Sequence, residues 1–190
     1  MKRKIISILT LFCGMQLLIS CCDQETFEIT FTGIESRTFV EENNALVEFG
    51  QQDLIDKEDL VIAVDLLETQ VLISEVRFQK KQSDVQVAQA AVVPCADPEI
   101  TYANRLQSII VEVIDVENGN TRIDVSDQIL VRGFNQSLTE FITLNGLGIS
   151  DFELIFSDTT NIPNRIEYVV EATFEDNSVF SVTGGIINFN

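Results

Sequence analysis

The chain has 190 residues, of which 30 are acidic, 12 are basic and none is histidine or tryptophan. A formal net charge of −18 at pH 7 disfavours nucleic acid as a partner, because binding to DNA or RNA needs a basic surface. Without histidine, Ser-His-Asp and Cys-His catalytic arrangements and the usual histidine-containing catalytic zinc sites are excluded. We therefore expect a non-enzymatic protein with no cofactor and no metal site.

The first residues have the pattern of a secretory signal peptide. Lys2, Arg3 and Lys4 give a positive start, and a largely apolar run at 5–18 follows. This run is about 14 residues long, whereas a membrane-spanning helix needs about 20. We therefore expect residues 1–20 to be removed as a signal peptide.

The leader ends in Leu18-Ile19-Ser20-Cys21, which resembles the lipobox of bacterial lipoproteins. The resemblance implies cleavage before Cys21, a diacylglycerol on its sulfur and an acyl chain such as palmitate on its new amine. At about 0.8 kcal/mol per buried methylene, several chains hold a protein on a membrane without a spanning helix. Cleavage before Cys22 gives a poorer match. An ordinary secretory signal is the other alternative, but it usually ends in an Ala-x-Ala pattern, which is absent here.

Cleavage leaves nine basic and 30 acidic residues, so the formal charge becomes −21. Such a surface keeps a protein soluble and repels anionic lipid head groups. Because Cys13 leaves with the leader, Cys22 and Cys95 remain as candidates for a disulfide in an oxidising envelope compartment. This bridge would stabilise the fold by about 4 kcal/mol where geometry allows it. Two free thiols are the alternative.

The N-terminal half of the mature chain is predicted to be rich in strands. After a short tether at 21–26, Phe27, Ile29 and Phe31 alternate with polar residues, which indicates a strand with one buried face. Gly33 and the polar residues after it predict a turn. The other strands expected in this half are at 45–49, at 60–67 with both faces covered, at 71–78 and, with a short helix as the alternative, at 85–93.

Pro94-Cys95-Ala96-Asp97-Pro98 forces irregular backbone, because each proline removes a hydrogen-bond donor and restricts the residue before it. This places a seam between two halves near 94–104. The length nevertheless favours a single β-rich domain, residues 27–190, over two domains.

The C-terminal half begins with a predicted strand at 108–116. Its apolar residues stand at both odd and even positions, so both faces are expected to be covered, as at the centre of a sheet. Glu117-Asn118-Gly119-Asn120 predicts a hairpin turn, and a short strand is expected at 129–134. Ser137 and Glu140 match a capping box, which predicts one or two helical turns at 138–144.

The end of the chain has the clearest strand pattern. Apolar and aromatic residues alternate with mostly polar neighbours in two runs. The first run is Phe152, Leu154, Phe156, and the second is Ile166, Tyr168, Val170, Ala172, Phe174. Glu175-Asp176-Asn177-Ser178 predicts a turn into a partner strand at 179–182, and Gly184-Gly185 predicts a bulge or a bend before 186–189. Many short strands with little helix predict a mainly β fold, an antiparallel β-sandwich of immunoglobulin-like or similar type.

Several motifs carry a resemblance to known proteins: the leader, Cys21-Cys22-Asp23, Cys95-Ala96-Asp97-Pro98, Tyr102-Ala103-Asn104, Phe134-Asn135 and the C-terminal run through Gly184-Gly185. With these motifs the chain resembles a group of uncharacterised Gram-negative lipoproteins, classed as a domain of unknown function. The resemblance implies secretion, lipidation and a β-rich domain, and it carries no known activity. Asp23 and Glu25 resemble export signals that send some such lipoproteins to the cell surface.

The stretch 115–120 invites comparison with a calcium-binding loop. In that loop glycine is sixth and glutamate twelfth, whereas here Gly119 is fifth and Ser126 is twelfth. A hairpin turn explains the stretch better. Asp124 and Asp127 stay available for a site of another type.

Two short motifs suggest glycosylation. Asp158-Thr159-Thr160 is similar to the O-glycosylation acceptor of some of these bacteria, with Thr159 as the acceptor. Asn135-Gln136-Ser137 matches the N-glycan sequon. A polar loop explains the first motif, and a bacterial lipoprotein gives little reason to invoke the second. Paired carboxylates at glycosidase spacing arise by chance among 30 acidic residues.

We therefore predict a lipid-anchored outer-membrane protein of the cell envelope, exposed at the surface, with a non-enzymatic binding or structural role. It contacts the membrane through its N-terminal lipid and takes an envelope protein or a glycan as its partner. One alternative is a fimbrial or pilus-type subunit that assembles by donating its last strand, near 186–189. Another is a glycan-binding accessory lipoprotein, which the absence of tryptophan disfavours.

Overall fold

The structure, a computed structural model, describes residues 26–43, 45–50, 54–74, 98–145 and 148–190. In these ranges the chain is mainly strand, with one α-helix and two short 3-10 helices. The strands are β1 (Thr26–Glu42), β2 (Ala45–Glu48), β3 (Leu54–Ile55), β4 (Leu60–Ser74), β5 (Glu99–Tyr102), β6 (Leu106–Asp115), β7 (Thr121–Asp124), β8 (Ile129–Val131), β9 (Gln136–Ser137), β10 (Asp151–Phe156), β11 (Arg165–Phe174), β12 (Val179–Thr183) and β13 (Ile187–Phe189). The helices are η1 (Lys57–Asp59), η2 (Ser126–Gln128) and α2 (Leu138–Asn145).

Contacts divide the chain into two compact units, Met1–Glu28 with Gln70–Thr101, and Ile29–Thr69 with Tyr102–Asn190. The described part of the first unit consists of the ends of β1, β4 and β5 that fall in it. There the Thr101 hydroxyl donates a hydrogen bond of 3.1 Å to the carbonyl oxygen of Phe27. The second unit holds the hydrophobic core.

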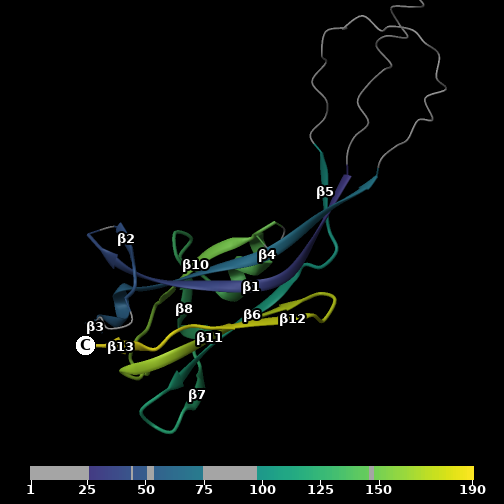
Figure 1. Ribbon diagram of the computed structural model, residues 1–190. Helices are drawn as coiled ribbons and strands as arrows, with labels where there is room; N and C mark the ends of the chain where they lie inside the picture. The colour runs from purple at the N-terminus through teal and green to yellow at the C-terminus, as the bar shows by residue number, and fades with distance from the viewer. Residues whose placement is uncertain (1–25, 44, 51–53, 75–97, 146–147) are drawn as a thin grey trace, which may run out of the picture. The chain divides into compact units, whose positions relative to one another are not determined.

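The strands form two sheets (Figure 1). One has the order β2-β1-β4-β10-β8-β9, with β5 also paired to β1, and the other has the order β3-β13-β11-β6-β7, with β12 also paired to β11. In the second sheet β11 is antiparallel to β6, β12 and β13, whereas the short pair β13–β3 is parallel.

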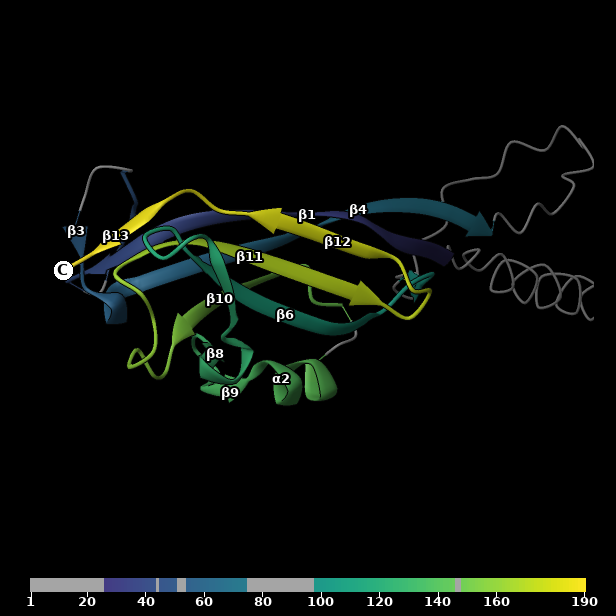
Figure 2. The ribbon, with the colours of Figure 1, turned by 90° about the horizontal axis from the view of Figure 1, so that it is seen from below.

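Side chains from both sheets share one core, which confirms the predicted β-sandwich. The rings of Phe31 in β1 and Phe174 in β11 lie 5.4 Å apart. The hydroxyls of Thr38 in β1 and Tyr168 in β11 lie 2.9 Å apart. Helix α2 contacts β6, β8 and β9 (Figure 2) and adds Leu138, Phe141 and Ile142 to the core.

Strand β11 has the predicted inward face, because its five alternating residues from Ile166 to Phe174 are each at most 1% exposed. The predicted hairpin to β12 is confirmed. Past β12, Gly184 lies so close to Tyr168 that an added Cβ would be 2.1 Å from the ring. Strand β12 ends at Thr183, directly before the predicted Gly184-Gly185, and at position 184 only glycine leaves room for the aromatic ring.

The turn predicted at Gly33 is wrong, since β1 continues unbroken from Thr26 to Glu42. The buried positions change parity along this strand, from Ile29 and Phe31 to Ile34 and Val40. An added Cβ on Gly33 would lie 3.2 Å from Leu67 Cδ1. This glycine therefore allows close packing against β4 rather than a reversal of the chain.

The two strands predicted at 60–67 and 71–78 are instead one strand, β4, within the residues described. Coverage of both faces, also predicted, holds only at its start, where Leu60, Val61 and Ile62 are each 1% exposed. Farther along, Leu67 is 41% exposed, so the outer face opens to solvent.

Strand β6 also departs from the prediction. It lies inside its sheet as expected, but Ile110 on its outer face is 38% exposed, so only one face is buried. Between the pairs Thr173–Ser108 and Phe174–Leu106 the register shifts, which leaves Gln107 as an extra residue. This bulge explains why Leu106 and Ile109 both point inward.

Shorter predicted elements are largely confirmed. The strand expected at 45–49 is β2, and that expected at 129–134 ends at Val131, where a turn begins. The capping box is present at 3.3 Å in both directions, from the Glu140 amide to the Ser137 hydroxyl and from the Ser137 amide to the Glu140 carboxylate. Residues 85–93 lie outside the described ranges.

Candidate binding surfaces

The three cysteines predicted to matter, Cys21 for lipidation and Cys22 and Cys95 for a disulfide, lie outside the described residues. Their roles remain predictions. Among the described helices, none has the length and apolar character needed to cross a membrane.

The carboxylate of Asp115 holds the hairpin turn after β6. Its Oδ1 accepts hydrogen bonds of 3.0 Å from the backbone amides of Glu117 and Asn118, and its Oδ2 accepts one of 2.8 Å from the Asn118 side chain. These bonds lower the pKa of Asp115, and the bond from the Asn118 side chain has the largest effect. The turn explanation of the stretch 115–120 is therefore the one that the geometry supports.

Three other aspartates, Asp124, Asp158 and Asp176, each bind a residue two positions later. Each accepts bonds of 2.9 Å from the backbone amide and 2.6 Å from the hydroxyl, of Ser126, Thr160 and Ser178 respectively. The hydroxyl bond is the largest cause of a lowered pKa in all three. These four aspartates thus stabilise turns. In the described ranges, no group of three or more acidic or cysteine side chains is placed to hold a metal ion.

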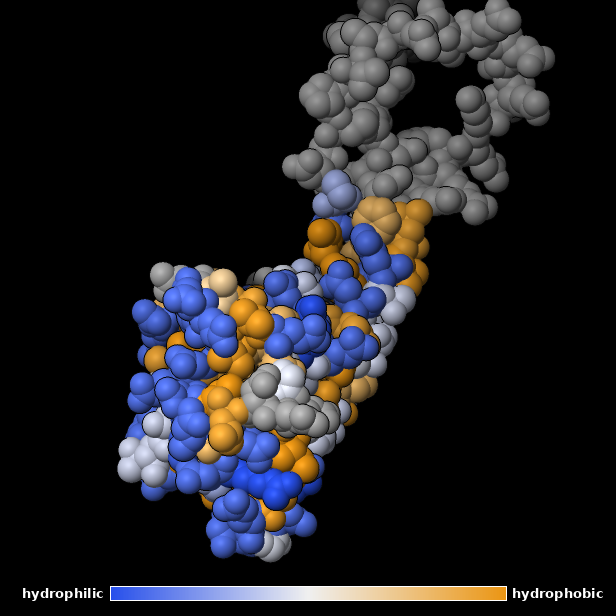
Figure 3. Space-filling view, turned by 60° about the vertical axis from the view of Figure 1, so that its left-hand side comes forward, coloured by the Kyte–Doolittle hydropathy of each residue, from blue (hydrophilic) through white to orange (hydrophobic). Residues whose placement is uncertain are grey.

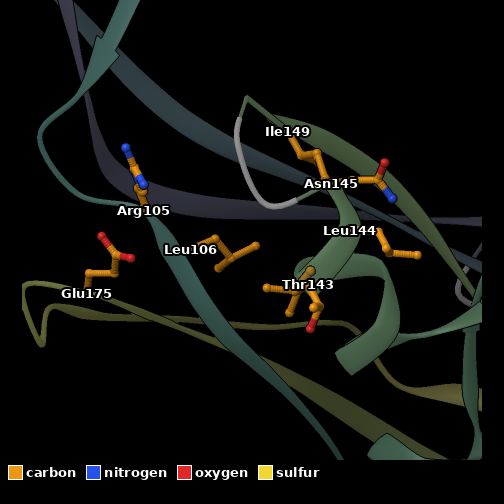
Figure 4. Close-up of a pocket in the computed structure, with 8 residues that line it drawn as sticks. Arg105, Leu106, Thr143, Leu144, Asn145, Ile149 and Glu175 are labelled. Carbon is orange, nitrogen blue, oxygen red and sulfur yellow. The ribbon is translucent and has the colours of Figure 1, made fainter.

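An open pocket of about 500 Å³ lies beside the C-terminal end of α2 (Figure 4). Leu106, Ile142 and Ile149 give it apolar walls. Arg105 and Glu175 lie on one side of it and Asn145 on the other. This pocket was not predicted from the sequence, since its walls come from the start of β6, the end of α2 and the β11–β12 turn. None of the described residues that line it is aromatic, so these residues offer no stacking platform for a sugar.

Strand β12 is a free edge within the described part of the chain, because it pairs only with β11. At its two ends, the Gly184 amide donates to the Tyr168 carbonyl at 2.9 Å and the Phe174 amide donates to the Ser178 carbonyl at 3.0 Å. In an antiparallel ladder every second residue bonds to the partner strand. Phe180 and Val182 therefore turn their backbone groups toward β11. The backbone groups that turn outward are those of Val179, Ser181 and Thr183.

The molecular surface is mixed in polarity on the face shown in Figure 3. Hydrophilic residues predominate on the face shown in Figure 3, with apolar residues between them. The large apolar side chains that are exposed include Val179, at 51%, and Leu144 at the pocket, at 69%.

No protein-family model matches the chain, and no curated protein matches it. Among solved structures, the crystal structure of the major pilin subunit of Bacillus cereus is similar at 5% identity, with a TM-score of 0.21. The match covers 87% of this chain and 69% of that one. A likeness this weak carries no argument about fold or function.

Proposed function

We propose that the protein is a lipid-anchored protein of the outer membrane that binds another envelope protein and has no catalytic role. The observation that carries this proposal is the lipobox-like end of the leader at Cys21, which only four residues separate from Thr26, where β1 begins. At about 3.4 Å per residue, such a tether reaches less than about 20 Å, so the β-domain works close to the membrane.

The part of the chain that follows this anchor supports binding better than chemistry. Four aspartates, a residue type that can serve as a ligand or a catalyst, already accept hydrogen bonds from their own turns. The free edge of β12 and the pocket beside α2 are the surfaces that a partner can use.

The fimbrial and glycan-binding alternatives receive less support. The strand that a fimbrial subunit would donate is β13, whose Ile187 and Phe189 are 0% and 5% exposed in the chain's own core. Donation to a neighbour would have to remove both side chains from that core. The described lining of the pocket has none of the aromatic residues that commonly hold sugars.

Metabolic labelling with an alkyne-bearing fatty acid tests the anchor. The wild-type chain and a Cys22→Ala variant are expected to take up the label and fractionate with the outer membrane. A Cys21→Ala variant is expected to do neither. The adjacent cysteine serves as the matched control, because it has the same chemistry one residue away. Equal labelling of the Cys21→Ala variant would refute the assignment of the anchor.

A further inference from the structure

The edge of β12 lacks the devices that usually protect a sheet edge. Exposed edge strands are commonly very short, charged or interrupted by proline, because an open row of amides invites pairing with other chains. The strands at the ends of the two sheets follow this rule, since β3 and β9 have two residues each, β2 ends in Glu48 and β7 carries Arg122 and Asp124. Strand β12 is Val-Phe-Ser-Val-Thr, with neither charge nor proline.

The inner face of this edge is apolar and incompletely covered. Phe180 and Val182 are half-buried and pack against the core. The ring of Phe180 lies 5.6 Å from that of Phe174. A strand added beside β12 would extend the sandwich and cover both side chains, provided that its own inward residues were apolar.

The outer face of the same edge carries a carboxylate, and the turn before it carries another. Glu171 lies opposite Ser181 in the β11–β12 register, and among the described residues it forms no ion pair. Asp176 is exposed in the turn that leads into β12, where its carboxylate accepts hydrogen bonds from Ser178. A second copy of a chain with a charge of −21 is repelled by this face, whereas outward-pointing cationic side chains are attracted.

We propose that β12 accepts an extended segment of a partner protein as an additional strand, with apolar residues facing Phe180 and Val182 and basic residues facing Glu171. In this mode the backbone hydrogen bonds to Val179, Ser181 and Thr183 supply affinity, and the alternating side chains supply selectivity. The inference deepens the binding role proposed above by naming the chemistry of the partner.

The test uses the full lipidated chain in detergent and a blocked heptapeptide of alternating valine and lysine. Its readout is amide hydrogen exchange across 179–183. We expect this peptide to slow exchange at the three outward amides, and the effect to weaken as salt rises. A Val-Glu peptide of the same length is expected to leave exchange unchanged.

Two variants at position 181 test whether the backbone amide there contributes to binding of the added strand. Ser181→Pro removes an outward amide that β11 does not use, so the fold should survive, but the added strand loses its bonds there. We expect it to weaken peptide binding about tenfold, as the loss of one or two hydrogen bonds implies, while Ser181→Thr binds like the wild type. Equal binding by Ser181→Pro and wild type, protection confined to another part of the chain, or no binding of the Val-Lys peptide would overturn the proposal.

If thermal melting shows that the proline variant is unfolded, a Val-Lys peptide with alternate N-methylated amides decides the matter on the wild-type chain. Loss of binding then supports strand addition, and undiminished binding overturns it. The outcome is separable from that of the anchor. A chain labelled at Cys21 that ignores the peptide refutes only the edge proposal, and one that binds the peptide without being labelled refutes only the anchor.

Discussion

The side chain of Asn104 acts as a strand neighbour for Phe31, 73 positions earlier in the chain. The Phe31 amide donates to Asn104 Oδ1 at 2.8 Å, and Asn104 Nδ2 donates to the Phe31 carbonyl at 3.1 Å. Just before it, the Ala103 amide donates to the Ile29 carbonyl at 2.9 Å. A single amide side chain thus satisfies both backbone groups of a buried residue on β1.

Replacing Asn104 with alanine should therefore be costly. Two buried backbone groups lose their partners at once, at about 1–3 kcal/mol each, so we expect a loss of about 2–6 kcal/mol in the free energy of unfolding. Urea denaturation measures it. Asn161→Ala, at an exposed position in a loop, is the control and is expected to change stability little. An Asn104→Ala variant as stable as the control would show that the bonds to Phe31 contribute nothing.

Gly184→Ala tests the contact between the glycine and Tyr168. Because the new Cβ would lie 2.1 Å from the ring, Tyr168 or the backbone must move, and we expect a loss of about 1–3 kcal/mol. Gly185→Ala is the matched control, since the neighbouring glycine is exposed. Denaturation midpoints of the two variants that coincide would contradict this close approach.

The last strand should be needed for the chain's own stability. Ile187 is fully buried, so Ile187→Ala is expected to cost about 2–5 kcal/mol, and removal of residues 186–190 should cost more. A fimbrial subunit that donates this strand would instead keep a folded monomer and lose only its polymers. Circular dichroism and gel filtration of the truncated chain separate the two outcomes.

The Asp115 turn predicts how stability depends on pH. Its folded-state pKa is lowered by bonds from Asn118 and Glu117, so its contribution is present above the unfolded pKa of about 4 and is lost as pH falls toward the folded value. Asp115→Asn should therefore have a smaller free energy of unfolding than the wild type at neutral pH. This difference should become smaller in acid. Urea denaturation at neutral and at acidic pH measures the difference in free energy of unfolding. Asp127→Asn controls for the change in net charge. A difference that is constant or widens in acid would contradict the assigned bonds.

Sequence periodicity located the elements whose residues repeat regularly and have matching turn chemistry. The β11–β12 hairpin is such a case: alternating apolar residues lead into a turn with Asn177 at φ 65°, a left-handed conformation that asparagine tolerates. The capping box at Ser137 and Glu140 likewise identified α2.

The features that were not predicted from the sequence depend on contacts between distant segments. Gly33 resembles a turn residue until the position of Leu67 is known. Strands β3 and β9 have two residues each, too few to show any period. The pocket beside α2 and the free edge of β12 exist only once the sheets are assembled, because each depends on what the rest of the chain leaves uncovered.

Cross-linking of intact cells that express a C-terminally tagged copy tests the central claim most directly, with the Cys21→Ala variant alongside. We expect the wild-type chain to be recovered with one other protein of the envelope, and the Cys21→Ala variant to lose it because the chain no longer resides at the membrane. A ladder of its own subunits, or recovery of the chain alone, would contradict an anchored protein that binds an envelope partner.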